Sequence, residues 1–430
     1  MAKENTLGVL ELNDSGLKLL QGSQVLLDSP GFALVSDKQL LVGKPARLQA
    51  KLHPLQSQNK FWQRMDTEAI TSQNPKCRHH ADLIFEHLQT IKNTHKHIEN
   101  LVLALPAHYS QTQLSLLMGI GQHCQLNIIG LVDTAVASLS SRAVVGRHYF
   151  IDLHLHQALI SQVDVDGEVR NSRIEAVPEA GLNACQDLCV RLIAEQFIQQ
   201  TRFNPLHKAE TEQELYNQLE TTLQACQQQG ESTLELAGYK AKITLQMLED
   251  NTHALISKIN RKMGNYSGQL FITERCNNLP GFAKAFPQAI VLSSEQLSDN
   301  IHQHSQAIVG SADGLQLVAS LPANKQIPEP RQQAAATHLL WQHQAHPVNQ
   351  TLHINKTQNK PLSELHDPSS ICAIKRFPGG LKICDIQADT TMVNGKSATE
   401  GQSLISGDQI EVASLPHPFT VISVVGKHGA

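Results

Sequence analysis

The chain lacks a large excess of charge of either sign. Of its 430 residues, 35 are Lys or Arg and 39 are Asp or Glu, giving a formal net charge of −4. Nucleic-acid-binding proteins usually carry a basic surplus or stripe, so this balance argues against that class. The N-terminus lacks the apolar core of a secretory signal, and no apolar run approaches the ~20 residues that span a bilayer. The sequence therefore predicts a cytoplasmic protein with no membrane insertion.

Metal-binding cysteine patterns are also missing. The eight cysteines are scattered and form no closely spaced double pair of the kind found in zinc sites. Cys185 and Cys189 are four residues apart, which places them on one face of a helix. Two buried thiols are the favoured interpretation, because a zinc site needs further ligands at suitable spacing. Histidine, by contrast, is abundant: its 22 residues make the charge sensitive to pH between about 5 and 7.

The order of local patterns divides the chain into three parts. Residues 1–321 alternate between short apolar runs and helical patterns, such as residues 80–91, which is typical of α/β layers. Residues 322–349 are rich in Pro, Gln, Ala and His and predict a linker with one short helix around residues 334–343. Residues 350–430 hold short alternating runs and turns, which predict an all-β domain. No internal repeat is evident.

Five segments of the first part form an ordered set. They are residues 42–54 (VGKPARLQAKLHP), 104–109 (ALPAHY) followed by Gln113, 127–137 (NIIGLVDTAVA), 203–220 (beginning FNPL) and 243–249 (ITLQMLE). In sequence and in order, the set resembles the ATPase domain of DnaK-type, seventy-kilodalton heat-shock chaperones. The resemblance implies an α/β fold of the actin-like, heat-shock-chaperone ATPase type, with two lobes, over residues 1–321.

The phosphate-binding turns of that family are altered here. The family's first turn reads Asp-Leu-Gly-Thr-Thr, where this chain has residues 11–15 (ELNDS). The second reads Asp-Leu-Gly-Gly-Gly-Thr, where this chain has residues 152–157 (DLHLHQ). Glycines in such turns let backbone N–H groups approach the phosphates, which a Cβ prevents. The resemblance thus implies a cleft in which Asp14 adds negative charge and His154 adds bulk.

Other nucleotide contacts of the family are replaced as well. Its Gly-Gly-Ser adenosine loop aligns with residues 274–276 (ERC), and its adenine-covering Glu-x-x-Lys with residues 220–223 (ETTL). The lysine that helps to activate the attacking water aligns with Trp62 or Gln63, while a neighbouring arginine survives as Arg64. Phosphoryl transfer relies on positioning and charge, and each lost electrostatic contact costs about 10²–10³ in rate. The chain is therefore predicted to be a pseudo-ATPase without an ATP or Mg²⁺ cofactor. The implied cleft residues are Glu11, Asp14, Asp152, His154, Glu220, Glu274 and Arg275.

The second turn allows another interpretation. Alternate residues of a strand share one face, so Asp152, His154 and His156 could form a metal site or an acid–base cluster. Alternatively, the imidazoles fill a former glycine turn and plug an empty cleft. Because no further ligand is evident from the sequence, we favour the plugged cleft.

The C-terminal part carries its own ordered set. Its segments are residues 369–374 (SSICAI), 379–385 (GGLKICD), 393–396 (VNGK) and 404–410 (LISGDQI). The set resembles forkhead-associated (FHA) modules, which read phosphothreonine, and implies an all-β sandwich. Lys356 stands where the family has a phosphate-binding arginine, so a bidentate fork is lost, whereas Ser369 matches the phosphate-contacting serine. The implied phosphopeptide residues are Lys356, Ser369, Ser370 and Thr390.

Both resemblances together predict a non-catalytic adaptor or scaffold. Its partners would be proteins, and weak or altered binding of a phosphorylated peptide by the tail is the less favoured alternative. The alternative is a divergent ATP-binding, chaperone-like protein or nucleotide-dependent switch. Nucleotide binding by the purified protein distinguishes the two hypotheses.

Overall fold

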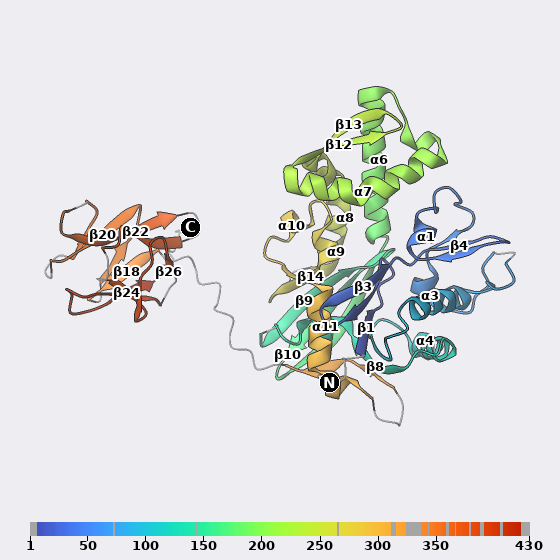
Figure 1. Ribbon diagram of the computed structural model, residues 1–430, viewed down its shortest axis with the longest axis horizontal. Coiled ribbons are helices and arrows are strands. Elements are labelled where there is room, and N and C mark those ends of the chain that lie inside the picture. Colours follow the sequence, from blue (N-terminus) through green and yellow to red (C-terminus); the bar gives the residue numbers. More distant parts are fainter. Residues whose placement is uncertain are drawn as a thin grey trace. The chain divides into compact units, whose positions relative to one another are not determined.

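The computed structural model describes residues 7–71, 74–142, 144–264, 266–310, 315–323, 337–342, 344–357, 361–365, 367–377, 380–387, 391–404 and 407–422. Its contacts divide the chain into two compact units, Met1–Gln326 and Ile327–Ala430. The first unit mixes helices with several sheets, and the described part of the second is built from antiparallel sheets (Figure 1). The predicted combination of an α/β part and a β part is therefore confirmed.

Two six-stranded sheets frame the first unit and share the arrangement of five of their strands. In the first sheet, β1 (Leu7–Glu11) pairs antiparallel with β2 (Leu17–Gln21) and parallel with β7 (Asn100–Leu105). In the second, β9 (Gly146–Leu153) pairs antiparallel with β10 (Gln157–Val165) and parallel with β14 (Leu270–Thr273). Outer strands extend both sheets, namely β3 (Gln24–Ser29), β8 (Ile128–Asp133) and β16 (Leu317–Val318) in the first, and β11 (Glu168–Pro178), β15 (Ile290–Leu292) and β17 (Ser320–Pro322) in the second. This structural repeat is one that the sequence did not reveal.

Strand β7 shows why the apolar runs become central strands. Leu101, Leu103 and Leu105 pack into the core beneath α3 (His80–Thr94) and α4 (Gln111–His123). Val102 and Ala104 face the opposite way, into the core shared with α5 (Thr134–Leu139) and α11 (Ser294–Gln303). A strand covered on both faces is apolar at every position instead of alternating. The predicted helix over residues 80–91 is confirmed as α3.

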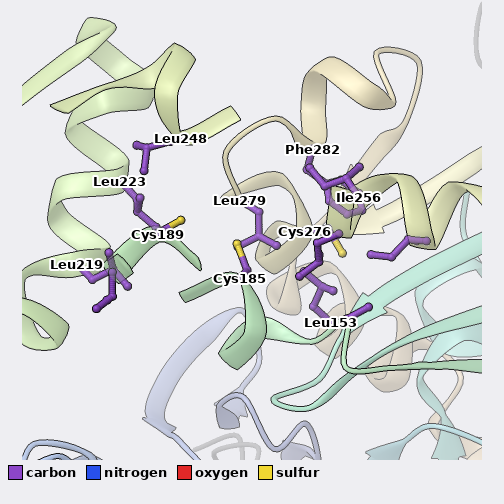
Figure 2. Packing of buried hydrophobic residues seen from close by; sticks show 14 of the residues in the cluster. Leu153, Cys185, Cys189, Leu219, Leu223, Leu248, Ile256, Cys276, Leu279 and Phe282 are labelled. Carbon is purple, nitrogen blue, oxygen red and sulfur yellow. The ribbon is translucent and has the colours of Figure 1, made fainter. Parts of the chain in front are cut away.

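A helical layer covers one end of the second sheet. Helix α6 (Leu182–Thr201), α7 (Ala209–Gln229) and α8 (Leu245–Met263) lie together with the hairpin of β12 (Glu231–Leu236) and β13 (Tyr239–Thr244) (Figure 1). Their shared core includes Leu219, Leu223, Cys185 and Cys189 (Figure 2). Both cysteines are fully buried, as predicted for two core thiols. The shorter elements of the unit are β4 (Ala33–Val35), β5 (Leu40–Val42), α1 (Lys44–Arg47), β6 (Ser57–Gln58), α2 (Phe61–Arg64), the 3₁₀ turn Pro205–His207, α9 (Glu274–Asn277), α10 (Phe282–Ala285) and α12 (Ser305–Ile308).

The second unit packs two antiparallel sheets around one core. One sheet has the order β19-β18-β28-β27-β24-β25 and the other β21-β20-β22-β23-β26. Both contribute to a cluster that contains Trp341, Ile354, Ile374 and Phe419. The strands are β18 (His338–Trp341), β19 (Gln344–Pro347), β20 (Thr351–Asn355), β21 (Leu362–Ser363), β22 (Ser370–Phe377), β23 (Gly380–Cys384), β24 (Thr391–Val393), β25 (Lys396–Ser397), β26 (Ser403–Leu404), β27 (Gln409–Val412) and β28 (Phe419–Ile422).

One local prediction is wrong. Within the helix expected around residues 334–343, the described residues form strand β18, which pairs with β19 and β28. Leu339 and Trp341 alternate into the core, and this short apolar alternation outweighs the polar composition that suggested a linker. The expected linker of residues 322–349 thus contains two strands of the second unit, while residues 324–336, with Pro328 and Pro330, lie outside the described residues. Across the described residues, no helix is long and apolar enough to cross a membrane.

Candidate functional site

The two sheets of the first unit meet through their equivalent hairpin turns. The Asn13 amide, in the β1–β2 turn, donates to Asp152 Oδ2 at 2.9 Å and to the Leu153 carbonyl at 3.0 Å. In return, the Leu155 N–H of the β9–β10 turn donates to Asp14 Oδ1 at 2.6 Å. Each turn therefore satisfies polar groups of the other, and no space for a phosphate is left between these atoms.

An ion pair strengthens this contact. His154 Nδ1 lies 3.2 Å from Asp14 Oδ1, and both side chains are only 3 % exposed. Burial by itself would raise the pKa of Asp14 and lower the pKa of His154. Their mutual hydrogen bond and attraction outweigh burial, so the pKa of Asp14 is lowered and the pKa of His154 is raised. Asp14 was expected to add negative charge to the cleft; in the structure its carboxylate is paired with the His154 imidazole of the opposite turn.

Arg275 connects both sheets from the start of α9. Its Nη1 donates to Glu11 Oε1 at 2.6 Å and lies 3.5 Å from Asp152 Oδ1, and its Nη2 donates to the Gly16 carbonyl at 3.2 Å. Burial would raise the pKa of Glu11, but the Arg275 guanidinium outweighs it and holds that pKa below its usual value. Arg275 is thus a cation that bridges the end of β1 and the end of β9.

Asp152 is the common acceptor of these contacts. Besides Asn13 and Arg275, Thr273 Oγ1 donates to its Oδ1 at 2.9 Å, and His154 Nε2 lies 3.8 Å from its Oδ2. We call the complete set the turn network. Its members are Glu11, Asn13, Asp14, Asp152, His154, Thr273 and Arg275.

Five of the seven predicted cleft residues belong to the turn network. The other two, Glu220 and Glu274, line a neighbouring cavity of about 460 Å³ together with Lys18, Lys44 and Arg47. Sequence comparison missed Asn13 and Thr273 as functional positions. Asn13 registered only as a lost glycine, although an amide that replaces a glycine in a turn can reach a facing carboxylate.

His156 does not join Asp152 and His154. Strand β9 ends at Leu153, so the alternation of a strand does not extend through the turn. The His156 Nε2 atom instead lies 2.9 Å from the Asn59 carbonyl. In the residues that the structure describes, no group of three or more His, Cys, Asp or Glu side chains is placed to hold a metal ion.

A tryptophan fills the position predicted for the water-activating lysine. Trp62 is buried, and its indole N–H donates to His87 Nδ1 at 3.1 Å. Burial lowers the pKa of His87 to about 4, so the ring is neutral, and its other nitrogen can donate to Ser29 Oγ at 2.7 Å. The surviving arginine, Arg64, is half exposed and pairs with Glu68 at 3.5 Å.

A second set of contacts joins the Lys44–Gln58 region to α7. The Lys51 N–H donates to Gln213 Oε1 at 2.7 Å, and Gln213 Nε2 donates to the Arg47 carbonyl at 3.2 Å. The Lys51 ammonium also lies 3.9 Å from the centre of the Tyr216 ring, a cation–π distance. Sequence analysis gave no signal for this clamp, because its partners are 162 or more residues apart.

The predicted phosphopeptide residues of the tail are only partly assembled. The Lys356 N–H donates to the Ser369 carbonyl at 3.1 Å, which brings these two residues together. Asp367 Oδ1 accepts from the Ser369 N–H at 2.7 Å, so this N–H is already bonded within the chain and a carboxylate lies next to Ser369. Ser370 Oγ lies 3.4 Å from His353 Nδ1. Thr390 lies outside the described residues.

Neither a protein-family model nor a curated protein matches this chain. Its function is therefore inferred from the geometry of its own side chains.

Replacing Arg275 with Gln should destabilise the first unit by about 3–5 kcal/mol, because it leaves the buried Glu11 carboxylate without its ionic partner. The measurement is urea unfolding followed by tryptophan fluorescence in a Trp341→Phe background. Trp62 is then the remaining tryptophan and reports on the first unit. A Glu11→Gln, Arg275→Gln double variant should recover part of the loss. Arg173→Gln, which breaks an exposed pair with Glu175, is the control and should cost no more than about 1 kcal/mol. Equal effects for Arg275 and Arg173 would contradict the bridging role.

The contribution of His154 should fall as pH rises. A raised folded-state pKa gives stability that is fully present below the unfolded value of 6.5 and is lost as pH rises through the folded pKa. For Asp14, whose pKa is lowered, stability is present above 3.8 and is lost as pH falls through the folded pKa. The gap in unfolding free energy between wild type and His154→Gln should thus be larger at about pH 6 than at about pH 9. The exposed His253→Gln serves as the control; a gap that is flat with pH would show that His154 is buried as a neutral ring.

Proposed function

We propose that this protein is a non-catalytic adaptor, built on a DnaK-type, actin-like ATPase fold whose nucleotide cleft is closed by its own side chains. The repeated sheet arrangement supports this fold, since two equivalent hairpin turns face each other at the positions where the resemblance places the phosphate turns. On this proposal, the chain is a scaffold that uses an enzyme fold to bind other proteins.

The turn network is the observation that carries the proposal. In a nucleotide-dependent ATPase, the triphosphate and its metal connect the two lobes. Here the Arg275 guanidinium and the His154 imidazole make that connection to Glu11 and Asp14. All four side chains are buried and paired, so ATP could enter only by breaking them and leaving buried charges without partners.

Charge adds to this exclusion. With His154 protonated, the turn network holds three formal negative charges, from Glu11, Asp14 and Asp152, and two positive ones, from His154 and Arg275. The remaining formal charge of −1 opposes the approach of a triphosphate in a low-dielectric site. Catalysis would also lack a cation beside the transferring phosphoryl group, because Trp62 fills the lysine position.

The alternative function is a nucleotide-dependent switch. The observation in its favour is the cavity of about 460 Å³ beside the turn network, which Lys18, Lys44 and Arg47 line. Its volume is within the range of small-molecule sites. Glu220 and Glu274 line the same cavity, however, and offset those cations.

For the C-terminal unit we propose an FHA-like β-sandwich that binds a protein partner without reading phosphate. Its two packed antiparallel sheets fit that fold. Asp367 occupies the approach to Ser369, and the lysine at position 356 lacks the forked geometry of arginine. Neither unit has the basic surplus that would favour nucleic acid as a partner.

Isothermal titration calorimetry with ATP and Mg²⁺ tests the closed cleft. We expect no heat of binding at micromolar ligand and no phosphate release above the uncatalysed background. Micromolar binding by the wild-type protein would favour the switch. Arg275→Gln provides a matched comparison, since opening the bridge without gain of ATP binding would show that loss of the glycines alone is sufficient to exclude nucleotide.

A phosphothreonine peptide array probed with the full chain tests the tail. We expect no binding that depends on the phosphate group, because Asp367 repels a phosphate near Ser369. Binding that requires phosphothreonine and disappears in Ser369→Ala would establish a phosphopeptide reader instead. Asp367→Asn is the informative companion variant: a gain of phosphopeptide binding would identify that carboxylate as the excluding group.

A further inference from the structure

A cavity of about 240 Å³ lies beside the clamp that joins Lys51 to Gln213. Its lining residues fall between residues 32 and 59 and between residues 183 and 217, two stretches that the structure describes without a gap. One wall therefore comes from the region that contains α1, and the other from the beginning of α6 and from α7 (Figure 1). A ligand in this cavity would contact both walls at once.

Arg47 supplies the cavity with a guanidinium that has no partner in the described part of the chain. Its side chain is half-buried and lines both this cavity and the neighbouring one of about 460 Å³. Among the residues that the structure describes, none forms an ion pair or a hydrogen bond with the guanidinium. A guanidinium presents several N–H donors in a planar fork that matches the two oxygens of a carboxylate. An oxyanion is thus the group that would complete this site.

The other cation of the cavity is already compensated. Lys51 Nζ lies 3.9 Å from Asp187 Oδ1 and 3.8 Å from Glu212 Oε1. These three side chains together keep a formal charge of −1, which opposes a second negative charge on a ligand held by Arg47. A ligand with a single negative charge therefore fits this site better than a doubly charged phosphate ester.

Uncharged groups complete the lining and indicate what else the ligand would carry. The side-chain amides of Asn59, Asn183 and Gln186 line the cavity and form no hydrogen bond with any described residue. Each amide offers both donors and an acceptor, and Phe32 and Ala50 add a small apolar surface. A few convergent polar groups beside an apolar wall are typical of small-molecule sites. Hydroxyl or amide groups on a short carbon skeleton would match them.

We infer that this cavity binds a small monocarboxylate that also carries hydroxyl or amide groups. Arg47 holds the carboxylate through paired charge-assisted hydrogen bonds, and Asn59 and Asn183 bind the uncharged polar groups from opposite walls. Because the ligand contacts both walls, its binding stabilises the first unit. The inference does not rest on the proposed function, since it requires neither a closed nor an open nucleotide cleft.

Isothermal titration calorimetry of the full-length protein tests the site with two carboxylates, gluconate and N-acetylglycinate. Their neutral counterparts, glucitol and N-acetylglycinamide, are titrated in parallel. We expect millimolar or tighter binding of at least one carboxylate, with a raised thermal midpoint, and no binding of its neutral counterpart. Arg47→Gln should weaken that binding about tenfold or more, because a paired, charge-assisted contact is lost. Arg261→Gln is the matched control and should bind like the wild type, because Arg261 is exposed on α8 and does not line the cavity.

Three results would overturn the carboxylate site. They are a wild-type protein that binds neither carboxylate, binding that Arg47→Gln and Arg261→Gln leave equally unchanged, and inorganic phosphate binding as tightly as the carboxylates through Arg47. Without ligand, Arg47→Gln should keep the wild-type thermal midpoint, since its guanidinium bonds to no described residue. If Arg47→Gln fails to fold, Asn183→Ala replaces it; this change removes one amide of the lining and should also weaken carboxylate binding.

Discussion

The first unit depends on the way the carboxylate of Asp152 is satisfied. An aspartate at the end of a central strand, away from water, needs several donors to compensate for its lost hydration. Asn13, Thr273 and Arg275 supply them or lie close, and each comes from a different part of the chain. One side chain thereby links the turn after β1, the end of β14 and the start of α9 to the end of β9. The neighbouring Asp14 carboxylate is also buried, and it is paired with the His154 imidazole of the β9–β10 turn.

Part of this arrangement could be predicted from the sequence, because it depends on local residue patterns. Amphipathic helices leave periodic apolar patterns, so α3 was predicted close to its observed bounds. Replacement of glycines drew attention to residues 11–15 and 152–157, and most of the residues named there contact one another in the turn network. Strand β18 was missed because its three apolar residues, Leu339, Leu340 and Trp341, are too short a run to stand out in a polar segment.

The sequence could not show which side chains are partners across the fold. Asp14 and His154 each looked like an obstacle to phosphate when considered alone, and only their 3.2 Å contact shows that they are partners. The same applies to Arg275 with Glu11, and to the clamp of Lys51 with Gln213, which join residues far apart in the chain. Local patterns carry no information on such long-range complementarity. The strand repeat was hidden for a related reason, since many different apolar residues can build the same sheet connectivity.

Every member of the turn network is a residue of the chain itself. This has a consequence for how the cleft would respond to the nucleotide concentration. When a dissociable ligand joins two lobes, the fraction of closed molecules follows mass action and changes with the ligand concentration. Asn13, His154 and Arg275 are part of the chain and are present at a fixed local concentration. On the proposed function, closure that rests on them would be the same in a cell rich in nucleotide and in one depleted of it. The surface that the two sheets present together would then keep one shape irrespective of the energy state of the cell.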